Sequence, residues 1–205
     1  MIRQFFTEYC AELGATLAKL PLERFEEFVL LLESAYLEER QVFLMGNGGS
    51  GSTASHVVCD LVKGVSYGLS KRFRAICLND NVPTMMAYAN DVSYEEIFVE
   101  PLKNFLHPGD LVIGLSGSGN SPNVLKAIDY ANRHGAHTIG LSGFNGGKLA
   151  KLARTSVVAP VNDMQKSEDA HLILLHAAFQ ILCARLRSPA APPAGEVVAG
   201  KREAR

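Results

Sequence analysis

The chain has 205 residues, of which 47% are hydrophobic and 20% are charged. These values are ordinary for a globular protein, and the length suffices for one α/β domain with a substantial core. With 20 basic and 21 acidic residues the net charge is −1, which excludes a strongly basic surface for nucleic acid or anionic membranes. If a ligand of this chain carries phosphate, local backbone dipoles rather than a basic surface must hold it, which points to a small molecule.

Cysteine usage and apolar patterning indicate a cytoplasmic protein. The cysteines are widely spaced and form no CxxC pair, which predicts reduced thiols at Cys10, Cys59, Cys77 and Cys183. Residues 1–10 show no signal-peptide pattern. The longest apolar segment, residues 170–184, is interrupted by His171, His176 and Gln180, so we expect no membrane span.

Two N-terminal segments show apolar side chains at helical spacing. They cover residues 2–18 and 22–40, and Pro21 separates them. Their apolar stripes lie outside the alternation that follows. We therefore expect both helices to pack against a neighbouring subunit rather than to cover the sheet.

From residue 41 onward, short β-rich runs alternate with helical segments. The predicted strands are residues 41–45, 73–78, 110–115, 136–141 and 155–159. The predicted helices are residues 50–63, 82–89, 93–104, 121–134, 146–153 and 165–187. This order predicts an α/β fold, a three-layer αβα sandwich with a five-stranded, doubly wound parallel sheet, in one domain over residues 1–187. Residues 188–205, rich in Ala, Pro and Gly, are predicted to be a disordered tail.

A glycine-rich loop follows the first predicted strand at residues 46–50 (Gly-Asn-Gly-Gly-Ser). Where such a loop opens a helix, unpaired backbone N–H groups and the positive end of the helix dipole favour an anion. Residues 46–51 also match GxGxxG, but a dinucleotide site needs an acidic residue about twenty residues on. Asp80 lies 34 residues past Gly46. A dinucleotide site and a purely structural turn are thus the weaker alternatives.

A second loop, residues 116–121 (Ser-Gly-Ser-Gly-Asn-Ser), follows the third predicted strand, and Pro122 then suits the first turn of a helix. A helix N-cap would explain one serine but not three, so the loop is predicted to cradle the phosphate of a ligand. A third loop, residues 142–147, either completes the rim of this site or is only a turn.

Titratable side chains interrupt two otherwise apolar helices. His56 and Asp60 are four residues apart and share one helix face, while Glu168, His171 and His176 lie among leucines in the last helix. Singly, each histidine is most simply a core or surface residue. If the two helices face each other, His56, Asp60, Glu168 and His176 form a metal site with two histidines and two carboxylates. Without a metal, the same groups form an acid–base pair with supporting partners.

These motifs resemble the sugar isomerase (SIS) domain, and within it most closely the phosphoheptose isomerases. The resemblance rests on the first loop, the histidine six residues after its serine, the pair at residues 90–91, the serine-rich loop, residues 142–147 and the last helix, and it covers residues 2–187. It implies an aldose–ketose isomerase that converts sedoheptulose 7-phosphate to D-glycero-D-manno-heptose 7-phosphate through an enediol. It also implies a homotetramer with active sites at subunit interfaces, often holding zinc.

The resemblance assigns roles to individual residues. Asp60 and His176 would be catalytic and would move the carbon-bound proton. Metal ligands would be His56, Asp60, Glu168 and His176, and the metal would stabilise the enediolate. The substrate would be bound by Asn47, Gly48, Ser50, Asp91, Ser116, Gly117, Ser118 and Ser121.

Three positions depart from the family pattern. Asp60 stands where the family has glutamate, Glu168 where it has glutamine, and Gly117 where it usually has threonine. These departures imply a divergent branch. Two alternatives therefore stay open: a non-catalytic SIS protein that binds a sugar phosphate and a protein partner, and an isomerase of pentose, hexose or amino-sugar phosphates.

Overall fold

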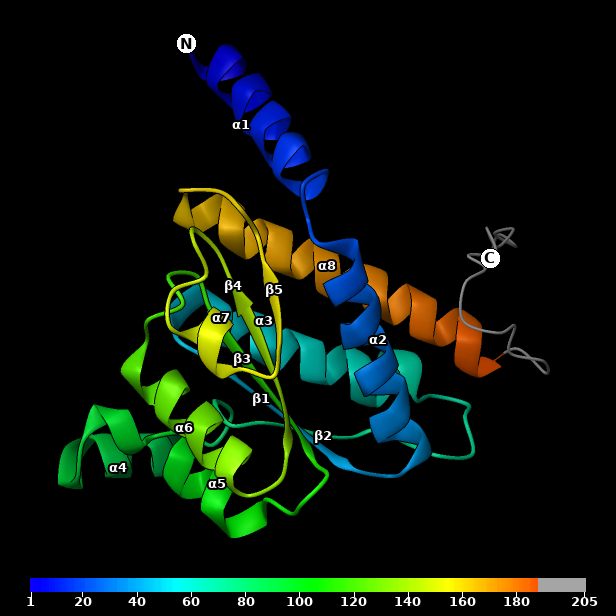
Figure 1. The fold of residues 1–205 in the computed structure, drawn as a ribbon, viewed down its shortest axis with the longest axis vertical. Helices are drawn as coiled ribbons and strands as arrows, with labels where there is room; N and C mark the ends of the chain where they lie inside the picture. Colours follow the sequence, from blue (N-terminus) through cyan, green and yellow to red (C-terminus); the bar gives the residue numbers. More distant parts are fainter. Residues whose placement is uncertain (188–205) are drawn as a thin grey trace.

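The computed structural model describes residues 1–187 and shows a parallel sheet with helices on both faces (Figure 1). The strands are β1 (Gln41–Gly46), β2 (Arg74–Cys77), β3 (Leu111–Ser116), β4 (His137–Ser142) and β5 (Thr155–Val158). They lie in the order β2-β1-β3-β4-β5, and every neighbouring pair is parallel. The predicted α/β fold is thus confirmed. The predicted disordered tail, residues 188–205, lies outside the described residues.

Each predicted helical segment contains a helix. The helices are α1 (Ile2–Leu17), α2 (Leu22–Leu37), α3 (Gly48–Cys59), α4 (Val82–Asp91), α5 (Val99–Phe105), α6 (Pro122–Arg133), α7 (Leu149–Leu152) and α8 (Met164–Arg187). Two shorter elements are the π-helix η1 (Asp60–Val65) and the 3₁₀-helix η2 (Tyr94–Glu96). The segment predicted as one helix at residues 93–104 is split because Ile97 and Phe98 turn into the core between η2 and α5.

The sheet separates two hydrophobic clusters. The first contains residues of α2, α3 and α8, and the second contains residues of α5, α6 and α7. Successive residues of β1 alternate between them: Val42 and Leu44 join the first cluster, Phe43 and Met45 the second. All four side chains are fully buried. This explains why the strands read as continuous apolar runs, because both faces of a parallel sheet are covered.

The prediction that α2 packs only against a neighbouring subunit is wrong. Phe28 is fully buried, Leu32 is 1% exposed, and both belong to the first hydrophobic cluster together with β1 and α8. The Thr155 hydroxyl of β5 also donates a hydrogen bond to Glu27 (2.6 Å). The apolar stripe of α2 shows that this helix buries a face, but the stripe does not identify the surface it covers.

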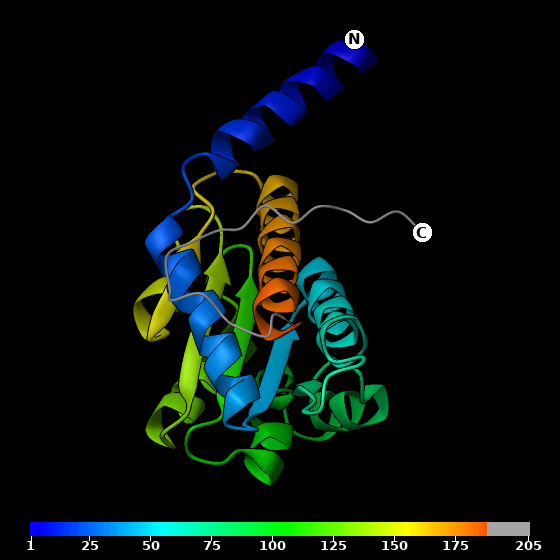
Figure 2. The ribbon, with the colours of Figure 1, turned by 90° about the vertical axis from the view of Figure 1, so that its right-hand side faces the viewer.

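Helix α1, by contrast, projects from the body of the protein (Figures 1 and 2). Phe5 and Phe6 are 69% and 68% exposed. Within residues 1–187, the side-chain contacts that hold α1 against α8 begin at the middle of α1: the Tyr9 hydroxyl donates to Asp169 (2.5 Å), and Lys166 pairs with Glu12 (2.7 Å). The apolar N-terminal half is therefore held away from the sheet with its phenylalanines uncovered.

Helix α8 is long and apolar enough to span a membrane by composition, with a mean hydropathy of 1.3 over its most apolar window. Its apolar residues nevertheless serve the core. Leu175 and Leu182 are fully buried in the first cluster, between α2 and α3. Figure 2 shows α8 lying beside α3. The apolar character of α8 is thus explained by packing.

The strand order places a topological switch point between β1 and β3. The chain leaves β1 toward β2 on one side and continues from β3 toward β4 on the other. In open parallel sheets, ligands bind beyond the carboxyl ends of the strands at such a point. Both predicted anion-binding loops, residues 46–50 and 116–121, begin there. The topology therefore places them side by side.

Candidate active site

A pair of amide side chains joins the two loops. Asn47 Nδ2 donates to Asn123 Oδ1 (2.9 Å), and Asn123 Nδ2 donates to Asn47 Oδ1 (2.9 Å). Asn123 is fully buried in the first turn of α6. The Tyr94 hydroxyl adds a third hydrogen bond, to Asn47 Oδ1 (3.0 Å). The side chain of Asn47 thus fixes the first loop to the helix that follows the second.

A third asparagine clamps the start of the first loop. Asn79 Nδ2 donates to the Gly46 carbonyl (2.7 Å), and the Gly46 N–H donates to Asn79 Oδ1 (3.2 Å). Asn79 follows β2, the strand next to β1. Both backbone groups of Gly46 are therefore satisfied by one side chain, which fixes the direction in which the chain leaves β1.

The three serines of the second loop have different hydrogen-bond partners. The Oγ atoms of Ser116 and Ser121 lie 2.9 Å apart, whereas Ser118 Oγ accepts a hydrogen bond from the Asn120 N–H (3.2 Å). Ser121 occupies the N-cap position of α6, but its side chain makes no capping hydrogen bond. The simple capping explanation of Ser121 is thus not what the geometry shows. Its hydroxyl, paired with that of Ser116, is free of the helix.

Glycines give the second loop its compact shape. Gly119 has φ +67°, and a Cβ atom there would lie 2.2 Å from the Gly146 carbonyl oxygen of the third loop. At Gly117 a Cβ atom would lie 2.3 Å from the Sδ atom of Met164. Met164 therefore fills the space that a side chain at position 117 would need. The glycine at position 117, where the family usually has threonine, thus leaves room for the Met164 side chain.

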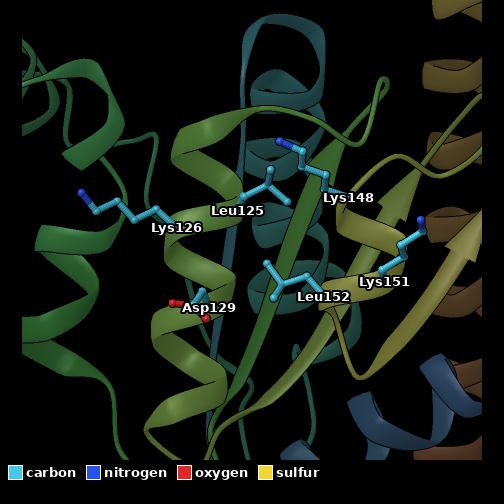
Figure 3. Close-up of a pocket in the computed structure, with 6 residues that line it drawn as sticks. All are labelled: Leu125, Lys126, Asp129, Lys148, Lys151 and Leu152. Carbon is cyan, nitrogen blue, oxygen red and sulfur yellow. The ribbon is translucent and has the colours of Figure 1, made fainter.

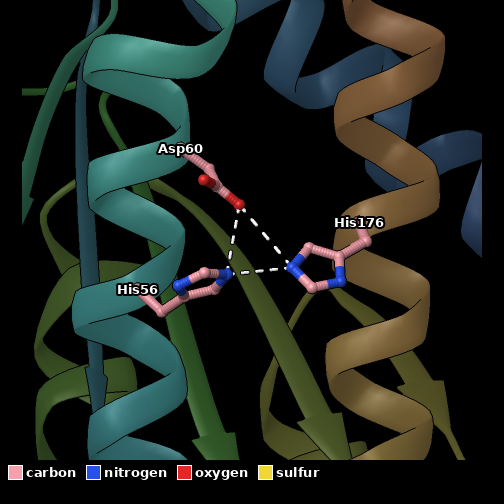
Figure 4. Close-up of side chains that lie close together, drawn as sticks. All are labelled: His56, Asp60 and His176. Carbon is pink, nitrogen blue, oxygen red and sulfur yellow. Dashed lines mark hydrogen bonds and ion pairs between the residues drawn. The ribbon is translucent and has the colours of Figure 1, made fainter.

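Three titratable side chains from α3, η1 and α8 converge (Figure 4). The Nε2 atoms of His56 and His176 lie 2.9 Å apart. Asp60 Oδ2 lies 3.3 Å from Nε2 of His56 and 3.7 Å from Nε2 of His176. The side chains are 49% (His56), 31% (Asp60) and 45% (His176) exposed, so solvent or a ligand can reach them. We call His56, Asp60 and His176 the two-histidine cluster.

Asp60 stands where α3 changes from an α-helix to the π-helix η1. The wider turn is held by the buried Ser66 hydroxyl, which donates to the Leu61 carbonyl (2.7 Å). Arg187 of α8 donates to the Gly64 carbonyl (3.1 Å) at the far end of η1. Single π-turns within helices are frequent at functional sites. Here the π-turn begins at Asp60, the residue that completes the two-histidine cluster.

The two-histidine cluster has the donors and spacing of a metal site. Two ligand atoms each about 2.0–2.1 Å from a tetrahedral zinc ion lie about 3.3 Å apart. The three ligand atoms here, two imidazole nitrogens and one carboxylate oxygen, all lie within 4.8 Å of one another. Their nearest separations, 2.9, 3.3 and 3.7 Å, bracket the expected value. The residues present fit a divalent metal.

Two predicted residues lie apart from the two-histidine cluster. The structure does not bring Glu168 into it, because the Glu168 carboxylate lies against Gly49 at the start of α3. Asp91 is exposed at the end of α4, and its carboxylate accepts a hydrogen bond from Asn90 (2.8 Å). Tyr94, rather than Asp91, reaches the first loop.

His171 has a different environment from His176, although both lie on α8. It is 1% exposed, and within residues 1–187 neither ring nitrogen has a hydrogen-bond partner. Burial lowers the pKa of His171. The ring is therefore held neutral inside the protein, away from the two-histidine cluster.

Two hollows lie near the second loop. One, of about 520 Å³, is lined by neutral side chains of Ser118, Asn120, Phe144, Asn145 and Asn162. The other, of about 510 Å³, lies open between α6 and α7 and is lined by Leu125, Lys126, Asp129, Lys148, Lys151 and Leu152 (Figure 3). The hollow between α6 and α7 contains none of the residues predicted for the site.

Three residues that shape the site were not predicted from the sequence: Asn79, Asn123 and Tyr94. Asn79 carries one usable signal, since it follows a strand that ends at the same edge of the sheet as the two loops. Asn123 is a polar residue in the apolar-patterned first turn of α6. Tyr94 carries no local signal, because its role depends on how η2 packs beside the first loop.

Comparison with known proteins identifies the family. The SIS domain family matches residues 6–143. The phosphoheptose isomerase of Paramagnetospirillum magneticum is 34% identical over 191 residues, which is 92% of this chain and 97% of that protein. That of Aquifex aeolicus is 31% identical over 88% of this chain and 94% of that protein. The structure of the Neisseria gonorrhoeae phosphoheptose isomerase shares the fold, with a TM-score of 0.82, 23% identity, and coverage of 90% of this chain and all of that one. This chain therefore belongs to the phosphoheptose isomerase family of SIS-domain proteins.

Proposed function

We propose that this protein isomerises sedoheptulose 7-phosphate to D-glycero-D-manno-heptose 7-phosphate through an enediol. The observation that supports this most strongly is the convergence of His56, Asp60 and His176 in a chain of this family. Moving a proton between C1 and C2 of an open-chain sugar requires a base near carbon, an acid near oxygen and a group that stabilises the enediolate. The two-histidine cluster supplies groups of all these kinds.

The phosphate of the substrate binds the second loop. Ser116 and Ser121 offer paired hydroxyls, and the backbone N–H groups at the start of α6 add the helix dipole. Because the phosphate does not react, its binding energy serves to orient the reacting end of the sugar. Gly117 and Ser118 complete the loop, while Asn47, Gly48 and Ser50 of the first loop, with Asp91, lie beside the sugar in this proposal.

Asp60 and His176 carry the protons. Their side chains lie on neighbouring elements, so one can serve carbon while the other serves the sugar oxygens. Asp60 Oδ2 and His176 Nε2, 3.7 Å apart, face the proposed metal position, which leaves Asp60 Oδ1 and His176 Nδ1 for proton transfer. The shorter side chain of aspartate places its carboxylate nearer the helix than glutamate would. The π-turn that begins at Asp60 moves the backbone there, and we infer that it offsets part of this difference.

His56, Asp60 and His176 would hold a divalent metal, and we propose zinc. When bound, the metal supplies a Lewis acid that stabilises negative charge on the enediolate oxygens. The donor set supports this, since two imidazole nitrogens and one carboxylate oxygen, all within 4.8 Å of one another, are ligands that zinc accepts. Glu168, assigned to the ligand set by family resemblance, lies against Gly49 instead, and we propose a different role for it.

We also propose that residues 1–187 form one domain that assembles as a homotetramer in the cytoplasm. The exposed Phe5 and Phe6 of α1 support the assembly, because apolar side chains at this density on a projecting helix mark an interface. Light scattering of the purified chain tests this proposal. A monomer at micromolar concentration contradicts it.

A substrate panel tests the proposed reaction. The purified chain is incubated with sedoheptulose 7-phosphate, ribulose 5-phosphate, fructose 6-phosphate and glucosamine 6-phosphate, and the aldose and ketose forms are quantified by chromatography. We expect kcat/KM for sedoheptulose 7-phosphate to exceed the others by about tenfold or more. A higher value for another sugar contradicts the substrate assignment. Binding without turnover of any sugar supports the non-catalytic alternative.

A further inference from the structure

The carboxylate of Glu168 occupies the space beside the backbone at the start of α3. A Cβ atom on Gly49 would lie 2.4 Å from Oε2 and 2.7 Å from Oε1 of Glu168. Side-chain carbons do not approach oxygens so closely, so this placement of the carboxylate depends on glycine at position 49. The first loop thus meets an acidic side chain of the same chain.

The start of α3 is a favourable place for this negative charge. Asn47, at the N-cap position, makes no side-chain capping hydrogen bond, so the first N–H groups of the 12-residue helix are left uncapped. None of the ion pairs found within residues 1–187 includes Glu168. The helix dipole is therefore the favourable charge partner that the described structure gives to Glu168.

The two loops consequently differ in charge. The second loop, residues 116–121, contains hydroxyls, amides and glycines but no acid. The first loop, residues 46–50, already faces a carboxylate. Both would attract an anion by their backbone alone, yet only the second remains available to one.

Along α8, Glu168 lies between Met164, whose Sδ atom adjoins Gly117 of the second loop, and His176 of the two-histidine cluster. It precedes His176 by eight residues of α8, which is about 12 Å of helix. Its contact residue, Gly49, precedes His56 by seven residues of α3. A sugar phosphate that extends along α8 from the second loop to the two-histidine cluster would therefore meet this carboxylate.

We propose that Glu168 is a specificity-determining residue that restricts the substrate to sugar monophosphates without a second anionic group. Hydroxyls of the sugar chain donate hydrogen bonds to its carboxylate. A second phosphate or a carboxylate on the ligand is repelled by it, and the one phosphate is directed to the second loop. This inference rests on the proposed function, because it assumes that a sugar phosphate binds between these elements.

The test compares two ligands that cannot isomerise: the alditol 7-phosphate and the alditol 1,7-bisphosphate made by reducing the corresponding sedoheptulose phosphates. Calorimetry measures the Kd of each for the wild type, for Glu168→Gln and for the control Asp129→Asn. Glutamine has nearly the shape of glutamate, so any exclusion of the bisphosphate by size persists in Glu168→Gln, whereas exclusion by charge is lost. Asp129→Asn removes one negative charge from α6, away from the first loop.

We expect the wild type and Asp129→Asn to bind the monophosphate at least about tenfold more tightly than the bisphosphate. In Glu168→Gln the ratio falls to within about threefold. Equal binding of both ligands by the wild type overturns the proposal, and so does an unchanged ratio in Glu168→Gln. If the wild type binds neither ligand, the proposed function itself fails.

Discussion

His56 and His176 are separated by 120 positions in the chain, yet their Nε2 atoms lie 2.9 Å apart. The planes of the two rings are inclined at 78°, so the rings meet edge to face and direct these nitrogens toward one region. Asp60, four residues after His56, points its Oδ2 atom into the same region (Figure 4). The parallel packing of α3 and η1 against α8 creates this convergence.

Replacing Asp60 separates the role of its charge from that of its length. We expect Asp60→Asn to lower kcat by at least about 10²-fold while KM changes by less than about threefold, because the proton carrier is lost and the phosphate site is intact. Asp60→Glu, which keeps the carboxylate, should retain at least about a tenth of the activity. Steady-state kinetics measures both. Full activity in Asp60→Asn would exclude Asp60 from proton transfer.

The predicted metal site can be tested by measuring the metal content of the purified protein. We expect about one zinc per chain in the purified wild type, and less than about a fifth of that in His56→Ala, because two remaining ligands bind weakly. Elemental analysis measures the content, and thermal unfolding reports the loss of the stabilising ion. His107→Ala, which changes an exposed histidine elsewhere, serves as the control. Equal metal in both variants contradicts the assignment.

The second loop should control binding rather than chemistry. Ser121→Ala removes a hydroxyl that lies 2.9 Å from that of Ser116 and makes no capping bond to α6. Hydrogen bonds to charged groups contribute about 1.5–3 kcal/mol, so we expect KM to rise about tenfold or more with kcat reduced by less than about threefold. Ser70→Ala, at an exposed loop position, is the matched control. A KM equal to that of the control would remove Ser121 from the phosphate site.

The burial of His171 leads to a prediction of how the free energy of unfolding depends on pH. Burial lowers the pKa of His171 below its ordinary value of 6.5, so the unfolded chain takes up this proton at a higher pH than the folded chain. The free energy of unfolding therefore falls as pH drops below about 6.5, by up to about 1.4 kcal/mol per pH unit from this residue.

In His171→Gln this contribution is absent. Urea unfolding of the wild type and the variant between pH 5 and pH 8 measures it, and the difference between the two proteins isolates His171 from the other titrating groups. We expect the wild type to lose stability relative to His171→Gln as the pH falls from 7 to 5, because burial lowers the pKa of His171. Parallel pH profiles would contradict the assignment of a neutral, buried ring.

The strand positions could be predicted because apolar runs bounded by glycine, serine and asparagine are local signals. β3 and β4 begin and end within one residue of expectation. The destination of α2 could not be predicted in the same way. Its stripe around Phe28 has the same form whether it faces a sheet or another subunit, and only tertiary packing decides between them.

As with the fold, the parts of the site that depend on local spacing could be predicted, and the parts that depend on tertiary packing could not. The spacing of His56 and Asp60 follows from one helix turn, but the meeting with His176 required the helices to pack together. Glu168 shows what spacing leaves undecided: it lies on the same helix as His176, yet its carboxylate reaches Gly49 instead of the two-histidine cluster. The buried Asn123 was missed because an amide pair depends on two distant segments.

The most direct test of the account is isotope exchange. Sedoheptulose 7-phosphate is incubated with the wild type in deuterium oxide, and the heptose 7-phosphate product is examined by proton NMR. An enediol with proton transfer by Asp60 and His176 predicts deuterium at C2 of the aldose, and no conversion in either Asp60→Asn or His176→Ala. A wild type that binds the sugar phosphate without forming the aldose, or variants that convert it at the wild-type rate, would contradict the account.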